Sequence, residues 1–367
     1  MTDKKNRPEW VPENASDGFT TEIVKGRDPA YDSGSRPRFI KKKERSTEEY
    51  VQGIRNGDRT ILAQAITLVE SNAKRHEDQA QKVINEILPY TGSSIRIGIT
   101  GVPGAGKSTF IESFGSYLCE EGHRVAVLAV DPSSSVTGGS ILGDKTRMET
   151  LTRNQNAFIR PSPSGGTLGG VNRKTRETIL LCEAAGFDVI LVETIGVGQS
   201  EVMVRSMVDF FLLLVLTGAG DELQGMKKGV MELADAILIN KADGDNRQKA
   251  KVARGEYNRI LHYLQPATKG WSSKAYTASA LYQEGMEEMW KVIQRFVETT
   301  KDSGVFTERR NAQTKDWIRA MIKDYLETSF FTHPSIKKQL PVLENKVVQG
   351  DLNVTTAVKE LIKLYET

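Results

Sequence analysis

The sequence predicts an α/β fold: a mostly parallel sheet covered by helices on both faces, with a helical module on either side. Two observations lead to this prediction. Between residues 93 and 304, short apolar runs alternate with amphipathic stretches, as in strands buried under helices. The first run, Ile95 to Ile99, leads into a glycine-rich loop and then into a stretch with helical periodicity. Strand, loop and helix therefore follow one another at the start of this region.

The glycine-rich loop has the form G-x-x-x-x-G-K-S, which identifies a P-loop NTPase when it lies between a strand and a helix. Glycines let backbone N–H groups converge on phosphate oxygens, and the helix start favours an anion. The lysine would contact the β- and γ-phosphates, and the serine hydroxyl would reach Mg²⁺. We expect the phosphates to contact Gly101, Val102, Pro103, Gly104, Ala105, Gly106, Lys107, Ser108 and Thr109.

The remaining elements follow from the same periodicities. The run from Phe210 to Leu216 is the most apolar, so we expect it at the centre of the sheet. The predicted strands are 95–100, 124–130, 187–192, 209–216, 236–240 and 274–278. The predicted helices between them are 107–121, 172–185, 200–207, 224–234, 246–264 and 284–299.

The flanking regions differ from this core. Residues 1–45 are polar and aperiodic, and we expect a disordered tail. Residues 46–92 form an N-terminal helical module that opens with a capping box from Ser46 to Glu49. Residues 305–367 are predicted as three helices. We expect that they cannot form a core alone and must pack on the main domain or on another subunit.

Composition narrows the functional classes. A net charge of +3 and the lack of a basic stripe count against a nucleic-acid or membrane targeting factor. No apolar run approaches the ~20 residues that span a bilayer. The N-terminus lacks a secretory signal, and two cysteines, Cys119 and Cys182, suit a reducing compartment, so we expect a cytoplasmic protein. Scattered histidines and the lack of C-x-x-C argue against a transition-metal site.

A second motif indicates which base the nucleotide carries. Asn240, Lys241 and Asp243 form N-K-x-D directly after a predicted strand. The Asp243 carboxylate can accept from both N1–H and the exocyclic amine of guanine, whereas adenine would leave it unpaired. Lys241 can lie over the base, and Asn240 can tie this loop to the glycine loop. Ser279, Ala280 and Leu281 fit the companion loop at the base edge, although an ordinary loop is an alternative.

Acidic residues at other strand ends suggest a hydrated Mg²⁺. Glu193 ends one strand three residues before Gly196, whose N–H could sense a γ-phosphate. Asp131 and Asp144 are further candidates, and either could instead position the attacking water. Arg147, or its neighbour Lys145, could neutralise phosphoryl charge, with an ordinary surface cation as the alternative.

The loop from Thr217 to Lys228 is charged and rich in glycine. It follows a predicted strand beside the nucleotide, which favours another switch segment, with a plain strand–helix connection as the alternative.

Together these motifs resemble the MeaB family of GTPases, which includes the methylmalonic aciduria type A protein and proteins once named arginine/ornithine transport kinases. The resemblance rests on G-V-P-G-A-G-K-S-T, D-P-S-S-S, G-G-S-I-L-G-D-K-T-R-M, E-T-I-G-V-G-Q-S-E, G-A-G-D-E-L-Q-G-M-K-K-G and N-K-A-D, and it covers residues 46–367.

The resemblance implies a homodimeric GTPase that binds GTP, GDP and Mg²⁺. It would act as a chaperone that gates adenosylcobalamin loading and protects or reactivates methylmalonyl-CoA mutase, or a related cobalamin-dependent mutase. It further implies that Ser108, Asp131, Asp144 and Glu193 form the metal and catalytic group. Lys227 would be the notable cation of a third switch, and the C-terminal helices would form a dimerisation arm.

Two other functional classes remain as alternatives. A nickel-insertion maturation GTPase would need a Cys/His metal site, which the sequence lacks. A small-molecule transport kinase is disfavoured because N-K-A-D argues against ATP and no amino-acid pocket is evident. Labelled GTP and arginine would test the kinase alternative.

Overall fold

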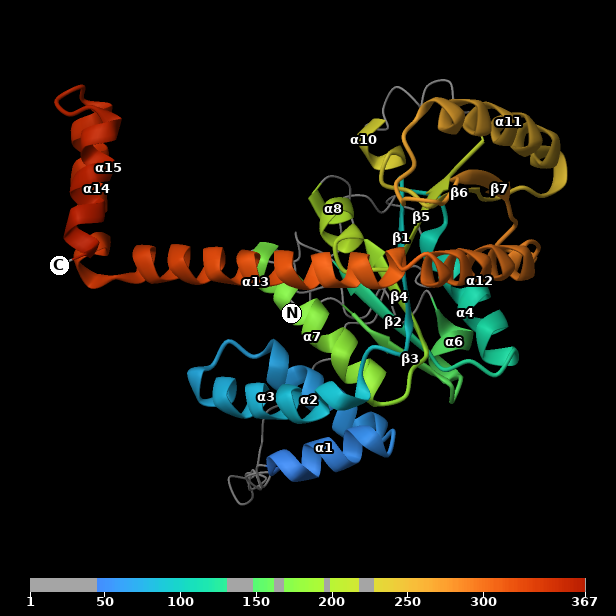
Figure 1. Ribbon diagram of the computed structural model, residues 1–367, viewed down its shortest axis with the longest axis horizontal. Coiled ribbons are helices and arrows are strands. Elements are labelled where there is room, and N and C mark those ends of the chain that lie inside the picture. The colour runs from blue at the N-terminus through green and yellow to red at the C-terminus, as the bar shows by residue number, and fades with distance from the viewer. Residues whose placement is uncertain (1–44, 131–147, 162–167, 195–198, 218–227, 367) are drawn as a thin grey trace, which may run out of the picture. The chain divides into compact units, whose positions relative to one another are not determined.

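The computed structural model describes residues 45–130, 148–161, 168–194, 199–217 and 228–366 (Figure 1). Its centre is a seven-stranded sheet in which every neighbouring pair is parallel, in the order β3-β2-β4-β1-β5-β6-β7. The predicted fold class is thereby confirmed. The strands are β1 (Ile95–Gly101), β2 (Val125–Val130), β3 (Ala157–Arg160), β4 (Val189–Thr194), β5 (Phe210–Val215), β6 (Ala236–Ile239) and β7 (Lys274–Thr277).

One strand prediction was wrong, and one strand was missed. The middle strand is β1, with three strands on each side, and the more apolar β5 lies next to it. Both strands are buried among neighbours, so apolarity alone does not rank them. The edge strand β3 was missed because it has only four residues, two of them half-buried. It is flanked by Asn156 and Pro161, which do not extend its apolar pattern.

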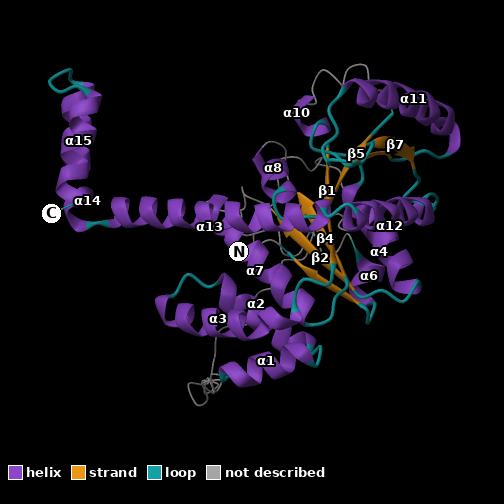
Figure 2. Cartoon of the chain, in the orientation of Figure 1, coloured by secondary structure: helices purple, strands orange, loops and turns teal. Residues whose placement is uncertain are grey.

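Helices cover both faces of the sheet, as Figure 2 shows. One face packs on α7 (Leu168–Ala184) and α8 (Gln199–Arg205), and the other packs on α4 (Lys107–Glu120) and α12 (Met286–Asp302). Alternate residues of β2 divide between these two cores, because successive side chains of a strand point to opposite faces. The other helices here are α6 (Glu149–Arg153), α10 (Lys228–Met231) and α11 (Arg247–Tyr263), which packs over β5, β6 and β7.

The N-terminal helices share a core with the sheet. They are α1 (Thr47–Arg55), α2 (Arg59–Glu70) and α3 (Lys74–Ile87). The predicted capping box is present, since Ser46 accepts from the Glu49 backbone and Glu49 accepts in return from the Ser46 backbone. Their apolar residues belong to the same buried cluster as α7 and one face of the sheet.

The C-terminal helices are α13 (Val305–Thr332), α14 (Pro334–Val348) and α15 (Val354–Tyr365). The first turns of α13 bind the edge where the strands begin: Arg310 pairs through two nitrogens with the buried Asp209, at 2.7 and 2.8 Å. Contrary to our expectation, α14 and α15 have a small core of their own, built from Ile336, Leu343, Ala357 and Leu361.

No helix in the described part of the chain is long and apolar enough to cross a membrane.

Candidate nucleotide-binding site

The predicted phosphate and base residues meet at one edge of the sheet, where the strands end. The glycine loop leaves β1, Asn240 follows β6, and Ser279 comes shortly after β7. Neighbouring parallel strands bring their carboxyl ends together, and open sheets bind ligands outside this edge.

The glycine loop is shaped by backbone that only glycine adopts readily. Gly104 and Gly106 have φ values of 82° and 84°, in the left-handed region. Gly106 also lies so close to Asn240 that an added Cβ would be 2.7 Å from the Asn240 amide nitrogen. The loop and the segment after β6 can therefore approach each other only because residue 106 has no side chain.

Lys107 lies in the first turn of α4 and points back over the loop. Its ammonium group donates to the carbonyl of Gly101 at 2.8 Å. Burial lowers the pKa of Lys107, and the nearby carboxylates of Glu193 and Glu201 act in the opposite direction. The side chain thus places a positive charge beside the start of α4, whose first backbone N–H groups favour an anion.

Ser108, in the first turn of α4, and Glu193, near the end of β4, meet at this edge. The Ser108 hydroxyl donates to Oε1 of Glu193 over 3.3 Å, and Glu193 is only 4% exposed. A hydroxyl and a carboxylate are the hard oxygen donors that Mg²⁺ prefers, so this donor pair fits that ion.

The guanine-type motif is held by a chain of hydrogen bonds. The Asn240 side chain donates to the carbonyl of Ala105 at 2.8 Å and accepts from the Ala280 backbone at 3.2 Å. The Ser279 hydroxyl donates to the Asp243 carboxylate at 2.5 Å. The Asn240 amide thereby joins the glycine loop to the loop after β7. Ser279, in this second loop, orients the Asp243 carboxylate.

The two remaining residues of these motifs are exposed. Lys241 has an exposed side chain and a φ of 58°, and Leu281 is 71% exposed. Either side chain is thus accessible to a base lying at this edge.

Six candidate site residues lie outside the described residues: Asp131, Asp144, Lys145, Arg147, Gly196 and Lys227. Their roles remain predictions. Among the described residues, no group of three His, Cys, Asp or Glu side chains is arranged to hold a metal.

Comparison with known proteins decides the family. Residues 62–335 match the model of the family described as methylmalonyl Co-A mutase-associated GTPase MeaB. The chain belongs to the MeaB family of GTPases.

Relatives of this MeaB-family GTPase extend over most of its length. A putative GTPase from Caulobacter vibrioides is 54% identical over 84% of this chain and 94% of its own. The GTPase ArgK of Escherichia coli is 46% identical over 88% and 98% of the two chains. The mitochondrial methylmalonic aciduria type A homolog of Mus musculus is 45% identical over 89% and 81%.

A solved structure supports the same assignment. The crystal structure of a LAO/AO transport system kinase superposes with a TM-score of 0.71 at 39% identity, covering 88% of this chain and 98% of that one. The P-loop GTPase fold of this MeaB-family chain is therefore shared along both the sheet and its helical flanks.

Sequence reasoning missed two polar side chains in this MeaB-family GTPase. Ser113, buried in α4, donates to the carbonyl of Ala280 at 2.5 Å. Asn246 bonds to both Lys241 and Thr217. Neither residue belongs to a motif, so their spacing in the sequence gave no signal. Asn246 lies directly before a helix, where an asparagine is typical of an N-cap, yet the Asn246 side chain makes no capping bond.

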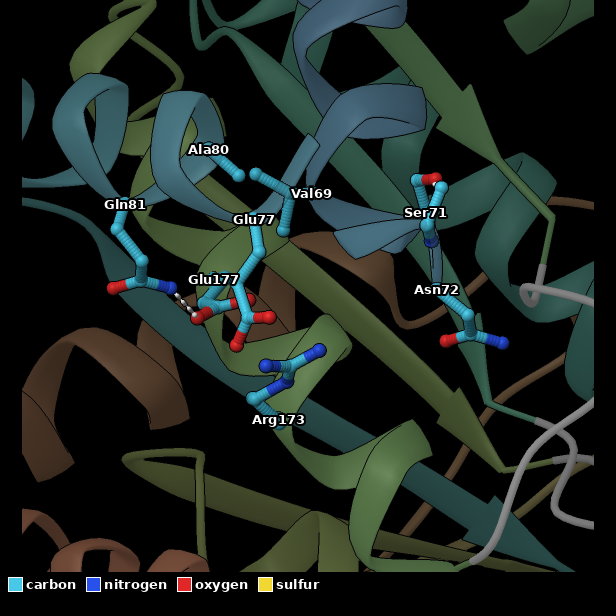
Figure 3. A pocket seen from close by; sticks show the side chains of 9 residues that line it. Val69, Ser71, Asn72, Glu77, Ala80, Gln81, Arg173 and Glu177 are labelled. Carbon is cyan, nitrogen blue, oxygen red and sulfur yellow. Dashed lines mark hydrogen bonds between the residues drawn. The ribbon is translucent and has the colours of Figure 1, made fainter. Parts of the chain in front are cut away.

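A separate cavity of about 140 Å³ lies between α3, the end of α2 and α7 (Figure 3). Its polar lining includes Glu77, Gln81, Arg173 and Glu177. None of the predicted nucleotide residues lines it. Glu177 is buried there, and Gln81 donates to it at 3.2 Å. This cavity is therefore distinct from the carboxyl edge of the sheet.

Proposed function

We propose that this GTPase binds Mg²⁺-GTP at the carboxyl edge of the sheet and uses hydrolysis to gate adenosylcobalamin loading on a mutase. The client would be methylmalonyl-CoA mutase or a related cobalamin-dependent acyl-CoA mutase, which the chain would also protect or reactivate. The observation that carries the nucleotide part is Asn240, which connects the glycine loop to the loop that would contact the base.

The residues of the site divide the work in the proposed reaction. Lys107 would compensate the charge of the β- and γ-phosphates, and Asp243 would select guanine. Ser108 and Glu193 would hold Mg²⁺, with Asp131 and Asp144 as the further acids. When bound, the ion would neutralise charge that develops on the phosphate oxygens.

The mutase as client is supported by the family description, which names a methylmalonyl Co-A mutase-associated GTPase. A completing cation can accelerate GTP hydrolysis by ~10³–10⁵-fold. We propose that the mutase orders Arg147 or Lys227 at the phosphates and so supplies this acceleration.

The test measures GTP hydrolysis with and without purified cobalamin mutases, including methylmalonyl-CoA mutase. We expect the cognate mutase to raise the rate by about tenfold or more. Lys107→Ala serves as the control, because it removes the phosphate-binding charge and should abolish nucleotide binding. An unchanged rate with every cobalamin mutase would contradict the chaperone role.

A second assay tests the kinase alternative. A solved structure similar to this chain is described as a LAO/AO transport system kinase, which makes this alternative worth testing. Labelled GTP is incubated with arginine, and the label is followed. Transfer of the labelled phosphate to arginine would replace the proposed function, whereas release as inorganic phosphate supports it.

We also propose that the C-terminal helices join two copies of the chain. From its middle onward, α13 exposes several large apolar side chains, which on a single chain would face water. They are Ile318, Met321, Ile322, Tyr325 and Leu326, between 39% and 73% exposed.

Sedimentation at micromolar concentration tests this dimer. Ile322→Asp should shift the chain to the mass of a monomer, whereas Lys323→Ala, on the same helix, should leave the dimer intact. A wild-type chain that sediments as a monomer would disprove the arrangement.

A further inference from the structure

The side chain of Asn246 connects the ends of two neighbouring strands. Asn246 is the last residue of a short turn, η3 (Gly244–Asn246), directly before α11. Its amide nitrogen donates to the carbonyl of Lys241 at 2.7 Å. Its amide oxygen accepts from the hydroxyl of Thr217, just past β5, at 2.6 Å. Both ends of one side-chain amide are therefore in use.

The bond to the Lys241 carbonyl is made at a residue with an unusual backbone conformation. Lys241 has a φ of 58°, one of two non-glycine residues with positive φ in the described part of the chain. A residue that has a Cβ is disfavoured in this left-handed region. It adopts such a conformation where contacts with the surrounding structure stabilise it. The Asn246 amide supplies such a fixing contact, because it holds the Lys241 carbonyl directly.

Lys241 lies between the two side chains that organise the proposed base-reading loop. Asn240, on one side, bonds to the glycine loop, and Asp243, on the other, accepts from Ser279. The backbone of Asn246 also donates to the carbonyl of Asp243 at 2.9 Å. Asn246 thus closes the loop from Lys241 to Asp243 by one side-chain bond and one backbone bond.

The bond to Thr217 fixes this closed loop to the sheet. Thr217 lies two residues beyond β5, which pairs with β1 up to Gly101 at the start of the glycine loop. A displacement of Asn246 would therefore move the base-reading loop relative to the strand beside the phosphates.

We propose that Asn246 is a positioning residue for guanine recognition: it holds Lys241 in its left-handed conformation and so aims the Asp243 carboxylate at the base. This inference rests on the proposed binding of guanine nucleotides. Asn246 itself need not touch the nucleotide.

The test compares GDP with inosine diphosphate, which lacks the exocyclic amine that Asp243 would read. In Asn246→Ala we expect GDP affinity to fall about three- to tenfold, as for the loss of one hydrogen bond. The affinity for inosine diphosphate should fall less, so the ratio of GDP affinity to inosine diphosphate affinity should decrease. A role limited to stability would lower the melting temperature and leave the preference unchanged.

Matched variants separate the two bonds of the amide. Asn246→Asp keeps an acceptor for Thr217 but cannot donate to the Lys241 carbonyl, so it should narrow the preference as the alanine variant does. Thr217→Val should show a smaller effect and Thr217→Ser none. Gln248→Ala, an exposed change on the same helix, is the neutral control.

The outcomes are distinct. A wild-type preference for GDP that is unchanged in both Asn246 variants overturns the positioning role alone. A wild-type chain that does not prefer GDP to inosine diphosphate overturns base reading by Asp243, and this inference with it.

Discussion

The hydroxyl of Ser108 and the carboxylate of Glu193 lie 3.3 Å apart although 85 residues separate them in the sequence. Ser108 follows β1 by way of the glycine loop, whereas Glu193 is within β4, directly opposite Ile99 of β1. The parallel pairing of these two strands therefore creates the pair of oxygen donors. Burial of Glu193 makes a negative charge costly unless it is compensated, which favours a cation beside it.

Removing the Glu193 carboxylate should weaken Mg²⁺ binding. In Glu193→Ala we expect the Mg²⁺ concentration needed for half-maximal GTP hydrolysis to rise by about 10–100-fold. GDP binding in the presence of a chelator should change little. Glu287→Gln removes an exposed carboxylate of α12 and serves as the charge control. An unaltered Mg²⁺ titration in Glu193→Ala would exclude this carboxylate as a metal partner.

The base preference should follow Asp243. In Asp243→Asn the amide can donate to the oxygen that xanthine carries in place of the amine of guanine. We expect the preference to shift from GTP towards xanthosine triphosphate, measured by competition binding. Should the variant retain the original preference for GTP by the same factor, another group reads the base.

Glu177 should make stability depend on pH. Burial raises the pKa of Glu177, while Arg173, the bond from Gln81 and Lys174 oppose the rise. A carboxyl whose pKa is higher in the folded state binds its proton more tightly there than when unfolded. Stability therefore falls as the pH rises from the unfolded pKa to the folded pKa, and the loss remains at higher pH.

Glu177→Gln should remove this penalty and keep an acceptor for Gln81. We expect urea midpoints above wild type at pH 7 and close to wild type at about pH 4, near the ordinary glutamate pKa. Glu77→Gln, an exposed change in the same cavity (Figure 3), is the control. Equal midpoints of Glu177→Gln and wild type at pH 7 would show that Glu177 carries no net penalty.

The ion pair between Arg310 and Asp209 should matter for stability. Asp209 is 1% exposed, and it also accepts from the Arg96 backbone, so it stays buried when Arg310 is lost. We expect Arg310→Ala to lower the free energy of unfolding by about 3–5 kcal/mol, the usual consequence of leaving a buried charge unpaired.

Arg319 provides the matched comparison. Its pair with Asp316, one turn apart on α13, is 78% and 69% exposed. Arg319→Ala should change stability by less than about 1 kcal/mol, as for exposed pairs in general. Chemical denaturation of both variants checks the contrast, and equal losses would argue against a special role for the buried pair.

The sequence was most informative where local pattern determines structure. Six of the seven strands and the helices α1 to α4 follow from periodicity and caps, because each buries an apolar face of its own. The positions of β1 and β5 in the sheet could not be predicted from local pattern, because strand order depends on crossovers between distant segments. β3 was too short to rise above its polar surroundings.

The same distinction holds for the site. The glycine loop and N-K-x-D are contiguous motifs, so their chemistry can be predicted from spacing. The bonds that Ser113 donates to Ala280 and Thr217 donates to Asn246 join residues 167 and 29 positions apart. Single polar residues of this kind carry no pattern, and only the packing of α4 and α11 against the loops reveals them.

The close approach of Gly106 and Asn240 has a consequence for how this protein can change. Any side chain at residue 106 would displace the amide that also holds Ala280. A substitution at residue 106 would thus disturb the loop after β7 as well as the glycine loop, because one amide contacts both. The two loops therefore cannot vary independently at this point.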